Sequence, residues 1–357
     1  MLWTIAAEVG LYSSFALLIG TLLMASIPEA RKPEILLSRR WMQLASLGAA
    51  VFSAAPVLEL ASRFYESDGF YGGIVRVIKD FQIGQIWALS LVLIILFYLF
   101  ITFAPVFQET QYRMIALFFV ISLIFAVSVN SHTASLSPYG AIYHAVHMIL
   151  MSVWTGILLQ VSWFSKNSRN WLSFLKWFSP VAMISVGLII FTGFLLMTLL
   201  MNVAEYPQTW SLNYGQYLLI KHLIVIPVLI FAFMNSFYIK SKLRKGSSLD
   251  PRKWTKAESA FLLLVFPVTG VLGQSEPPHN IEVTKATDGL SPLFTLFSPD
   301  ETIAFGPGVM SALFGVLALL FAALLIMQIR KNAPAVSAFA IGLLFTVSSY
   351  LFIMTSI

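Results

Sequence analysis

The chain has 357 residues, of which 58% are hydrophobic, only 11% are charged and none is cysteine. Because soluble domains carry about 25% charged residues, this composition excludes an ordinary soluble globule and favours a protein solvated by a lipid bilayer. The lack of cysteine excludes disulfides and thiolate metal ligands. The net charge of +6 does not indicate nucleic-acid binding, since the basic residues lie in short segments between apolar runs.

Ten apolar runs are suited to form transmembrane helices, each of which needs roughly 20 residues. In chain order they are 5–27, 41–61, 83–107, 114–134, 141–164, 177–201, 217–239, 257–274, 308–329 and 335–356. We therefore predict an all-α fold, a polytopic transmembrane helix bundle of about ten spans. No basic residue precedes the first run, so we expect it to be a membrane anchor and not a signal peptide.

The distribution of lysine and arginine predicts the orientation. Seventeen of the 22 basic residues lie on the side that follows odd-numbered spans, seven of them within 240–256, and five lie on the other side. Since loops rich in basic residues stay in the cytoplasm, we expect the N-terminus and the segments 62–82 and 275–307 to lie outside. No phosphate-binding loop motif occurs, so the sequence gives no sign of an ATP-driven motor.

The histidines are the most informative polar residues. All five fall on the predicted outer side, and they are His132, His144, His147, His222 and His279. Imidazole is the commonest metal-ligating side chain, so this distribution indicates a metal site. The alternative is that the histidines are amphipathic rings at the membrane interface.

The spacing around residue 147 favours copper. His144 and His147 are three residues apart, so they share a helix face, and Met148 and Met151 each follow a histidine by four residues. Thioether sulfur is a soft ligand that selects Cu(I), and imidazole accepts Cu(I) or Cu(II). Methionine is also a common core residue, so packing is the alternative for the two methionines.

A short turn at Pro138 predicts that His132 is brought against His144 and His147. The sequence therefore predicts three imidazoles at one mouth of the bundle, with His222 as the next nearest. If copper is bound there, acid should weaken binding, because protons compete with the metal for imidazole.

Three other polar residues lie within apolar runs. Lys221 is expected either to pair with Glu59 or Glu8 or to extend its amine to the interface. Glu258 is expected to open a span and to offset the basic segment before it. Asn235 is expected to form a hydrogen bond between helices.

A set of short motifs lies in order along these spans. They are Ser131-His132-Thr133-Ala134, His147 followed by Trp154-Thr155-Gly156, Tyr214-Gly215-Gln216-Tyr217 with Lys221, then Asn235, and Glu258 leading to Pro277-Pro278. In this order the chain resembles the copper resistance D (CopD) family of bacterial inner-membrane proteins. The resemblance covers best the residues 113–278.

This resemblance implies copper uptake or copper handling at the cytoplasmic membrane of a bacterium. His132 and His147 match the family's histidine positions, whereas His144 stands where relatives have aspartate. The chain is similar to Gram-positive members without a soluble copper-binding domain and with extra C-terminal spans. The expected division is a CopD-like bundle at 1–278, an extracytoplasmic loop at 279–307 and a helix pair at 308–357.

We accordingly expect a copper transporter, most simply an importer, and no enzyme. Its expected ligands and partners are Cu(I) or Cu(II), the lipid bilayer and, as a candidate, an extracytoplasmic copper-binding protein. One alternative is a copper-delivery or oxidase assembly factor that binds copper without conducting it. Another is a haem-binding membrane redox protein, since histidines on facing helices can ligate haem.

Overall fold

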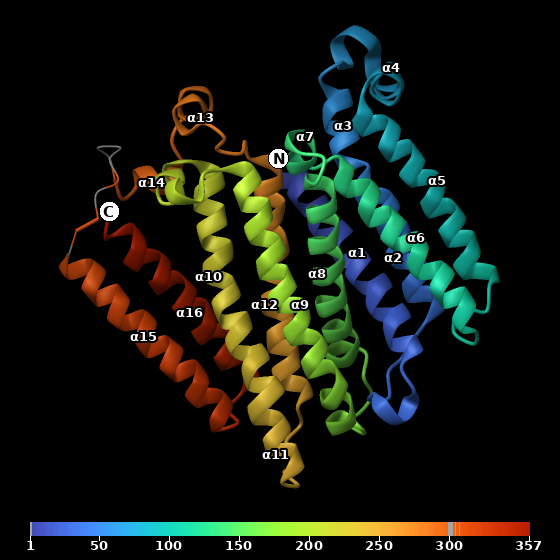
Figure 1. Ribbon diagram of the computed structural model, residues 1–357, viewed down its shortest axis with the longest axis vertical. Coiled ribbons are helices and arrows are strands. Elements are labelled where there is room, and N and C mark those ends of the chain that lie inside the picture. Colours follow the sequence, from blue (N-terminus) through green and yellow to red (C-terminus); the bar gives the residue numbers. More distant parts are fainter. Residues whose placement is uncertain (1, 299–302, 304, 307) are drawn as a thin grey trace. The chain divides into compact units, whose positions relative to one another are not determined.

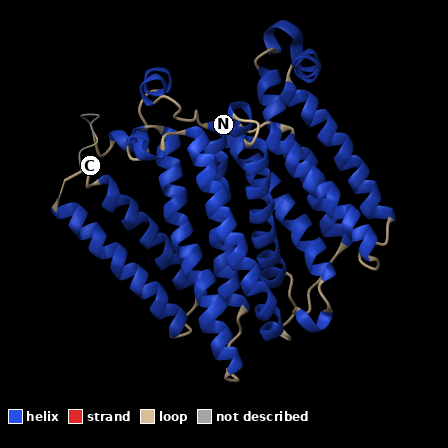
Figure 2. Ribbon diagram, in the orientation of Figure 1, coloured by secondary structure: helices blue, strands red, loops and turns tan. Residues whose placement is uncertain are grey.

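The computed structural model describes residues 2–298, 303, 305–306 and 308–357. Within these ranges the regular structure is helical, and the strand-like pairing is limited to one isolated bridge between Ile35 and Ser165 (Figure 2). Ten helices are long and apolar enough to cross a membrane. The predicted all-α bundle of about ten spans is therefore confirmed.

The chain forms two compact units. Unit 1 comprises Met1–Asn170 and Pro180–Leu199, and unit 2 comprises Trp171–Ser179 and Leu200–Ile357. Helix α9 (Trp171–Leu200) belongs to both units and contains Pro180 at the change from one to the other. A proline inside a helix removes one backbone hydrogen bond, which makes this a natural place for the division.

Unit 1 is built around its first helix. Helix α1 packs against α2, α6 and α8 (Figure 1). Buried apolar side chains such as Phe15, Phe97 and Ile124 form the core of this unit. The helices are α1 (Leu2–Ser26), η1 (Glu29–Arg31), α2 (Arg39–Ser53), α3 (Ala55–Ser62), α4 (Tyr65–Asp80), α5 (Gln82–Phe103), α6 (Thr110–Val129), α7 (His132–Leu136) and α8 (Gly140–Trp163). Helices α2 and α3 together make one span, Arg39–Ser62.

The closest approach in unit 1 is between α1 and α8. A Cβ atom on Gly20 would overlap the carbonyl of Gly156, and a Cβ on Gly156 would overlap the carbonyl of Ala16. Small residues let helix backbones approach in this way inside a membrane. One turn further along, Gln160 Nε2 donates a hydrogen bond of 2.8 Å to Thr21 Oγ1.

The predicted outer segment 62–82 is mostly helical. Helix α4 fills it and breaks at Gly69, whose φ of 69° lies in the left-handed region. Glycine has no Cβ and adopts this conformation at little cost.

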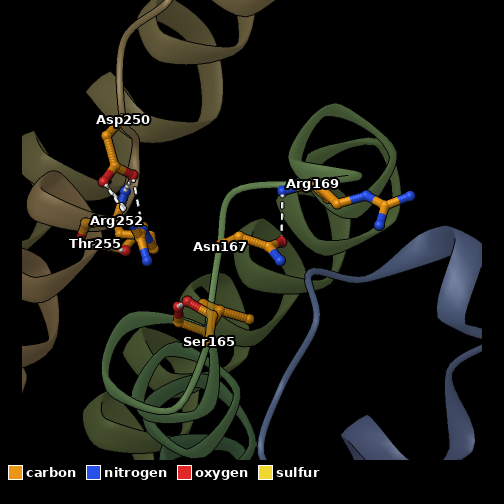
Figure 3. Close-up of polar contacts among 7 residues, drawn as sticks. Ser165, Asn167, Arg169, Asp250, Arg252 and Thr255 are labelled. Carbon is orange, nitrogen blue, oxygen red and sulfur yellow. Dashed lines mark hydrogen bonds and ion pairs between the residues drawn. The ribbon is translucent and has the colours of Figure 1, made fainter.

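Two polar loops are tied down by side-chain hydrogen bonds. In unit 1, Lys166 Nζ and Asn167 Nδ2 each donate over 2.9 Å to the Glu34 carboxylate. These hydrogen bonds, with the charge of Lys166, hold the pKa of Glu34 below its usual value. Figure 3 shows Asn167 turned back to accept from the backbone N–H of Arg169, over 3.0 Å.

In unit 2, the loop before α12 is shaped by Asp250. Its carboxylate accepts hydrogen bonds from the Arg252 guanidinium, the shortest being 2.7 Å, as Figure 3 also shows. The hydrogen bond from Arg252 lowers the pKa of Asp250. The carboxylate therefore remains ionised as it orders the start of α12.

Unit 2 packs α10 against α12 and α16, and α15 against α16. Its core includes Trp210, Leu223, Phe294 and Met354, so the segment 275–298 contributes to the packing. The elements after α9 are η2 (Val203–Glu205), η3 (Gln208–Ser211), α10 (Asn213–Phe233), the π-helix η4 (Met234–Ile239), α11 (Lys240–Arg244), α12 (Arg252–Gln274), α13 (Ile281–Asp288), α14 (Pro292–Thr295), α15 (Val309–Arg330) and α16 (Ala335–Met354).

Candidate metal site

The first three turns of α8 carry His144, His147 and Met148. Helix α7 packs on the start of α8, where a Cβ at Gly140 would overlap the Thr133 carbonyl. Helices α1 and α6 pack along α8 in the same unit. The three side chains are therefore held among neighbouring helices of unit 1.

His144 is oriented by a hydroxyl of α6. Its Nδ1 lies 3.0 Å from Ser128 Oγ, and Ser128 Oγ in turn donates to the Ile124 carbonyl over 2.8 Å. The hydroxyl has one proton, so if that proton goes to Ile124, Nδ1 of His144 is the donor in their contact and Nε2 holds the lone pair of the ring.

His147 is oriented in the same way by α9. Its Nδ1 lies 3.0 Å from Thr192 Oγ1, which donates to the Leu188 carbonyl over 2.7 Å. The same proton count applies to His147, whose Nδ1 is the donor if Thr192 directs its proton to Leu188. Gly193 leaves room beside the ring, because a Cβ there would lie 3.4 Å from His147 Cε1.

The two methionines differ in their surroundings. Met148 is buried in the apolar core of unit 1, and its sulfur lies 3.8 Å from the Oγ of Ser128, the residue that also orients His144. Met151 is half-buried one turn further along the helix. Met148 therefore packs in the core and shares a polar neighbour with His144.

Glu8 is a candidate that the sequence spacing alone did not place at this site. Helices α1 and α8 start at the same end of unit 1 and run in parallel from there to the Gly20–Gly156 contact (Figure 1). Glu8 precedes Gly20 by twelve residues, and His144 precedes Gly156 by twelve. With equal rise per residue, the carboxylate of Glu8 and the ring of His144 lie at about the same height. Tyr12 Oη donates to Glu8 over 2.8 Å.

The expected cluster of three imidazoles is not formed. Within the described ranges, no three His, Cys, Asp or Glu side chains are grouped so as to hold a metal ion. Helix α6 ends at Val129, earlier than expected, and His132 opens the separate helix α7 with its side chain exposed. His144 and His147 are also held by hydroxyls of different helices, α6 and α9.

The early end of α6 has a local cause. Ser131 is the N-cap of α7, and its Oγ accepts a hydrogen bond of 3.3 Å from the Ala134 N–H. Serine at this position stabilises a new helix start, so the chain does not continue α6 through His132.

His222 lies in unit 2 on α10, and its ring is exposed. Its Nδ1 lies 2.9 Å from the hydroxyl of Tyr206, a residue outside the spans. Burial raises the pKa of Tyr206 to about 12, so this hydroxyl keeps its proton at neutral pH. His279 is exposed in the segment after α12. Glu8 and Glu59 belong to unit 1, so their pairing with Lys221 stays a prediction.

Asn235 and Glu258 form a buried pair in unit 2. Asn235 Nδ2 donates over 2.7 Å to Glu258 Oε2, so the expected hydrogen bond between helices is present. Asn235 lies in the π-helix η4 and is 5% exposed, and Glu258 on α12 is 3% exposed. Helix α12 begins at Arg252, so Glu258 lies in its second turn and is engaged with Asn235 rather than opening the span.

Comparison with known proteins supports a copper-related family. Residues 172–272 match the family model of copper resistance protein D. Copper transport protein CutJ of Bacillus subtilis (strain 168) is 24% identical over 318 residues, which is 84% of this chain and 58% of CutJ. Inner membrane protein YebZ of Escherichia coli (strain K12) is 24% identical over 262 residues, which is 68% of this chain and 87% of YebZ. No solved structure matches.

The predicted resemblance to the copper resistance D family is thereby confirmed. The family-model match contains Lys221, His222, Asn235 and Glu258, and it does not reach the start of α8. A continuous match to CutJ over 84% of the chain, however, has to include α8. The described part of the chain has ten helices long and apolar enough to cross a membrane, and the chain spans 58% of the length of CutJ.

Proposed function

We propose that the chain binds copper at the outer end of α8 and carries it inward across the cytoplasmic membrane of a bacterium. The family match and the name of CutJ, a copper transport protein, support copper as the substrate. The basic loops support the orientation, because loops rich in lysine and arginine tend to stay in the cytoplasm and the start of α8 lies at the opposite ends of the spans. Copper would thus meet the histidines before it crosses the bilayer.

One observation carries this proposal. Both imidazoles of α8 are fixed through Nδ1 to a threonine or serine hydroxyl on a neighbouring helix, at 3.0 Å in each case. Histidines that ligate a metal usually hold their other nitrogen by such a hydrogen bond, which sets the tautomer and the ring orientation. His222 has a similar contact with Tyr206, but that tyrosine lies outside the membrane-length helices.

The ligand chemistry suits Cu(I). His144 and His147 would supply imidazole nitrogen, and Met148 and Met151 would supply thioether sulfur, the combination that favours copper over harder cations. His132 and His222 contribute less in this proposal, because their side chains are exposed.

Copper binding to the purified protein tests the proposal. Titration of Cu(I) against a competing chelator should show tight binding by the wild type and strongly weakened binding by the double variant His144→Ala, His147→Ala. His279→Ala is the matched control and should bind as the wild type does, since this loop histidine lies outside the site. Equal affinity of all three proteins would end the proposal. An absorption spectrum of the same sample would reveal haem, which would favour the redox alternative.

A further inference from the structure

A hollow of about 550 Å³ lies on unit 2, where α15 ends beside η4 and α11. It is lined by Tyr238, Lys242, Ala323, Ile326, Met327, Arg330 and Lys331. Three of these residues are cationic and none is acidic. The hollow is distant in sequence from α8, and the copper proposal does not use it.

The cationic rim is held in place by Tyr238. The Tyr238 hydroxyl donates over 2.8 Å to the backbone carbonyl of Arg330, which ties η4 to the end of α15. The Lys242 amine lies 5.6 Å from the centre of the Tyr238 ring. Among the described residues, Lys242, Arg330 and Lys331 form no ion pair. The hollow therefore gathers positive charge that the protein itself does not neutralise.

The wall below the rim is apolar. Ala323, Ile326, Met327 and Arg330 recur at three- and four-residue intervals, so they form one stripe along α15 that runs from apolar to cationic. Ala323, Ile326 and Met327 are exposed on a helix that is long and apolar enough to cross a membrane. In a bilayer, the apolar part of such a stripe faces the acyl chains of the lipids, and its charged end faces their headgroups.

Basic residues at the end of a span have a simpler explanation, which is that they fix topology or favour the helix C-terminus. That explanation does not require three of them to converge on one hollow from segments about 90 residues apart. It also does not account for an apolar stripe continuous with the cationic rim. A ligand that has both an anionic head and an apolar tail matches the two features together.

We propose that this hollow binds one anionic phospholipid. The phosphate lies among Lys242, Arg330 and Lys331, and an acyl chain follows Ala323, Ile326 and Met327. Each basic residue near a membrane surface adds about fivefold to the attraction of anionic lipid, so three of them give a preference on the order of a hundredfold over zwitterionic lipid. By contacting both η4 and α15, the lipid stabilises the attachment of the last two helices.

Lipid retention tests this site. The protein is purified into mixed micelles that contain phosphatidylglycerol or phosphatidylcholine with identical acyl chains, and bound lipid is counted by native mass spectrometry. The wild type should keep one phosphatidylglycerol and little phosphatidylcholine. The triple variant Lys242→Gln, Arg330→Gln, Lys331→Gln should lose this preference by at least tenfold.

The matched control changes three basic residues that do not line the hollow, Lys240→Gln, Arg244→Gln and Lys245→Gln. It removes the same charge and should keep the bound lipid. An equal loss in both triple variants would mean that net charge alone attracts lipid, and would overturn the site.

Two further arms complete the test. Inorganic phosphate added at the concentration of the lipid should not displace it, and displacement would show a phosphate site without an acyl component. Ala323→Trp, which fills the apolar part and keeps all charges, should reduce phosphatidylglycerol retention. Unchanged retention in that variant would exclude the proposed path of the acyl chain.

Discussion

His147 on α8 and His222 on α10 illustrate two different surroundings for the same side chain. The His147 ring is half-buried and fixed by Thr192, whose own proton is directed to a helix carbonyl. The His222 ring is exposed and bonded to Tyr206, a residue of the connecting segment. The residue type is the same, yet only the first ring is held by a hydroxyl of a neighbouring membrane-length helix. The difference teaches that the packing partner, more than the histidine itself, decides how firmly an imidazole is oriented.

Among the changes that test this comparison, loss of both α8 imidazoles should lower copper affinity the most. His144→Ala combined with His147→Ala should weaken Cu(I) binding by about a hundredfold or more, equivalent to about 2.7 kcal/mol, because both imidazole ligands are lost and only thioether sulfur remains. Competition with a chelator of known affinity measures the change. A decrease in Cu(I) affinity of less than threefold would show that His144 and His147 contribute no more to copper binding than is expected of His222.

The second-largest effect is expected from a change at the contact between α1 and α8. Gly156→Ala should cost about 1–3 kcal/mol of stability, because the new Cβ meets backbone that cannot move aside without a shift of the helix. The apparent melting temperature of the purified protein should fall. Gly187→Ala on α9 is the control, since nothing lies within 4 Å of its Cβ position. Equal melting temperatures for the two variants would show that α8 is not held by this contact.

The hydroxyl partners should have an intermediate effect. Thr192→Val keeps the shape of the side chain and removes the acceptor of His147 Nδ1, so copper affinity should fall about tenfold, the lower end of the range for such supporting contacts. Thr198→Val, on an exposed turn of the same helix, should leave affinity unchanged. Identical affinities for these two variants would show that the hydroxyl does not orient the imidazole.

The smallest effect is expected at His222. His222→Ala should lower copper affinity by less than about threefold, because loss of an exposed accessory group costs little compared with a fixed ligand. The same titration measures this change. A loss as large as that of the α8 double variant would move the site to unit 2 and reverse the comparison.

The sequence predicted the ten spans well, because each apolar run is long and clearly bounded by polar residues. It also predicted that His144, His147 and Met148 share a face of α8, since helical spacing alone decides this. Ser128 and Thr192 could not be identified in the same way. A hydroxyl within an apolar run resembles any other small residue until the packing of α6 and α9 on α8 is known.

The positions of His132 and Glu8 depend on local contacts for which the sequence offers only weak signals. His132 was expected within a span, but the N-cap hydrogen bond of Ser131 starts a new helix there. A serine three residues before alanine in a polar stretch is a weak signal of that kind. The height of Glu8 relative to His144 could not be inferred from the sequence alone, because it follows from the Gly20–Gly156 contact. Gly20 and Gly156 indicate close helix packing only when it is known that α1 and α8 are neighbours.

Copper flux tests the central claim most directly. Purified wild-type protein and the variant His144→Ala, His147→Ala are reconstituted into sealed vesicles, and Cu(I) entry is followed with an indicator inside, with His279→Ala as control. We expect uptake by the wild type and the control, and uptake near that of empty vesicles for the double variant. Uptake by a folded double variant equal to that of the wild type would contradict the assignment of the α8 histidines to the copper path.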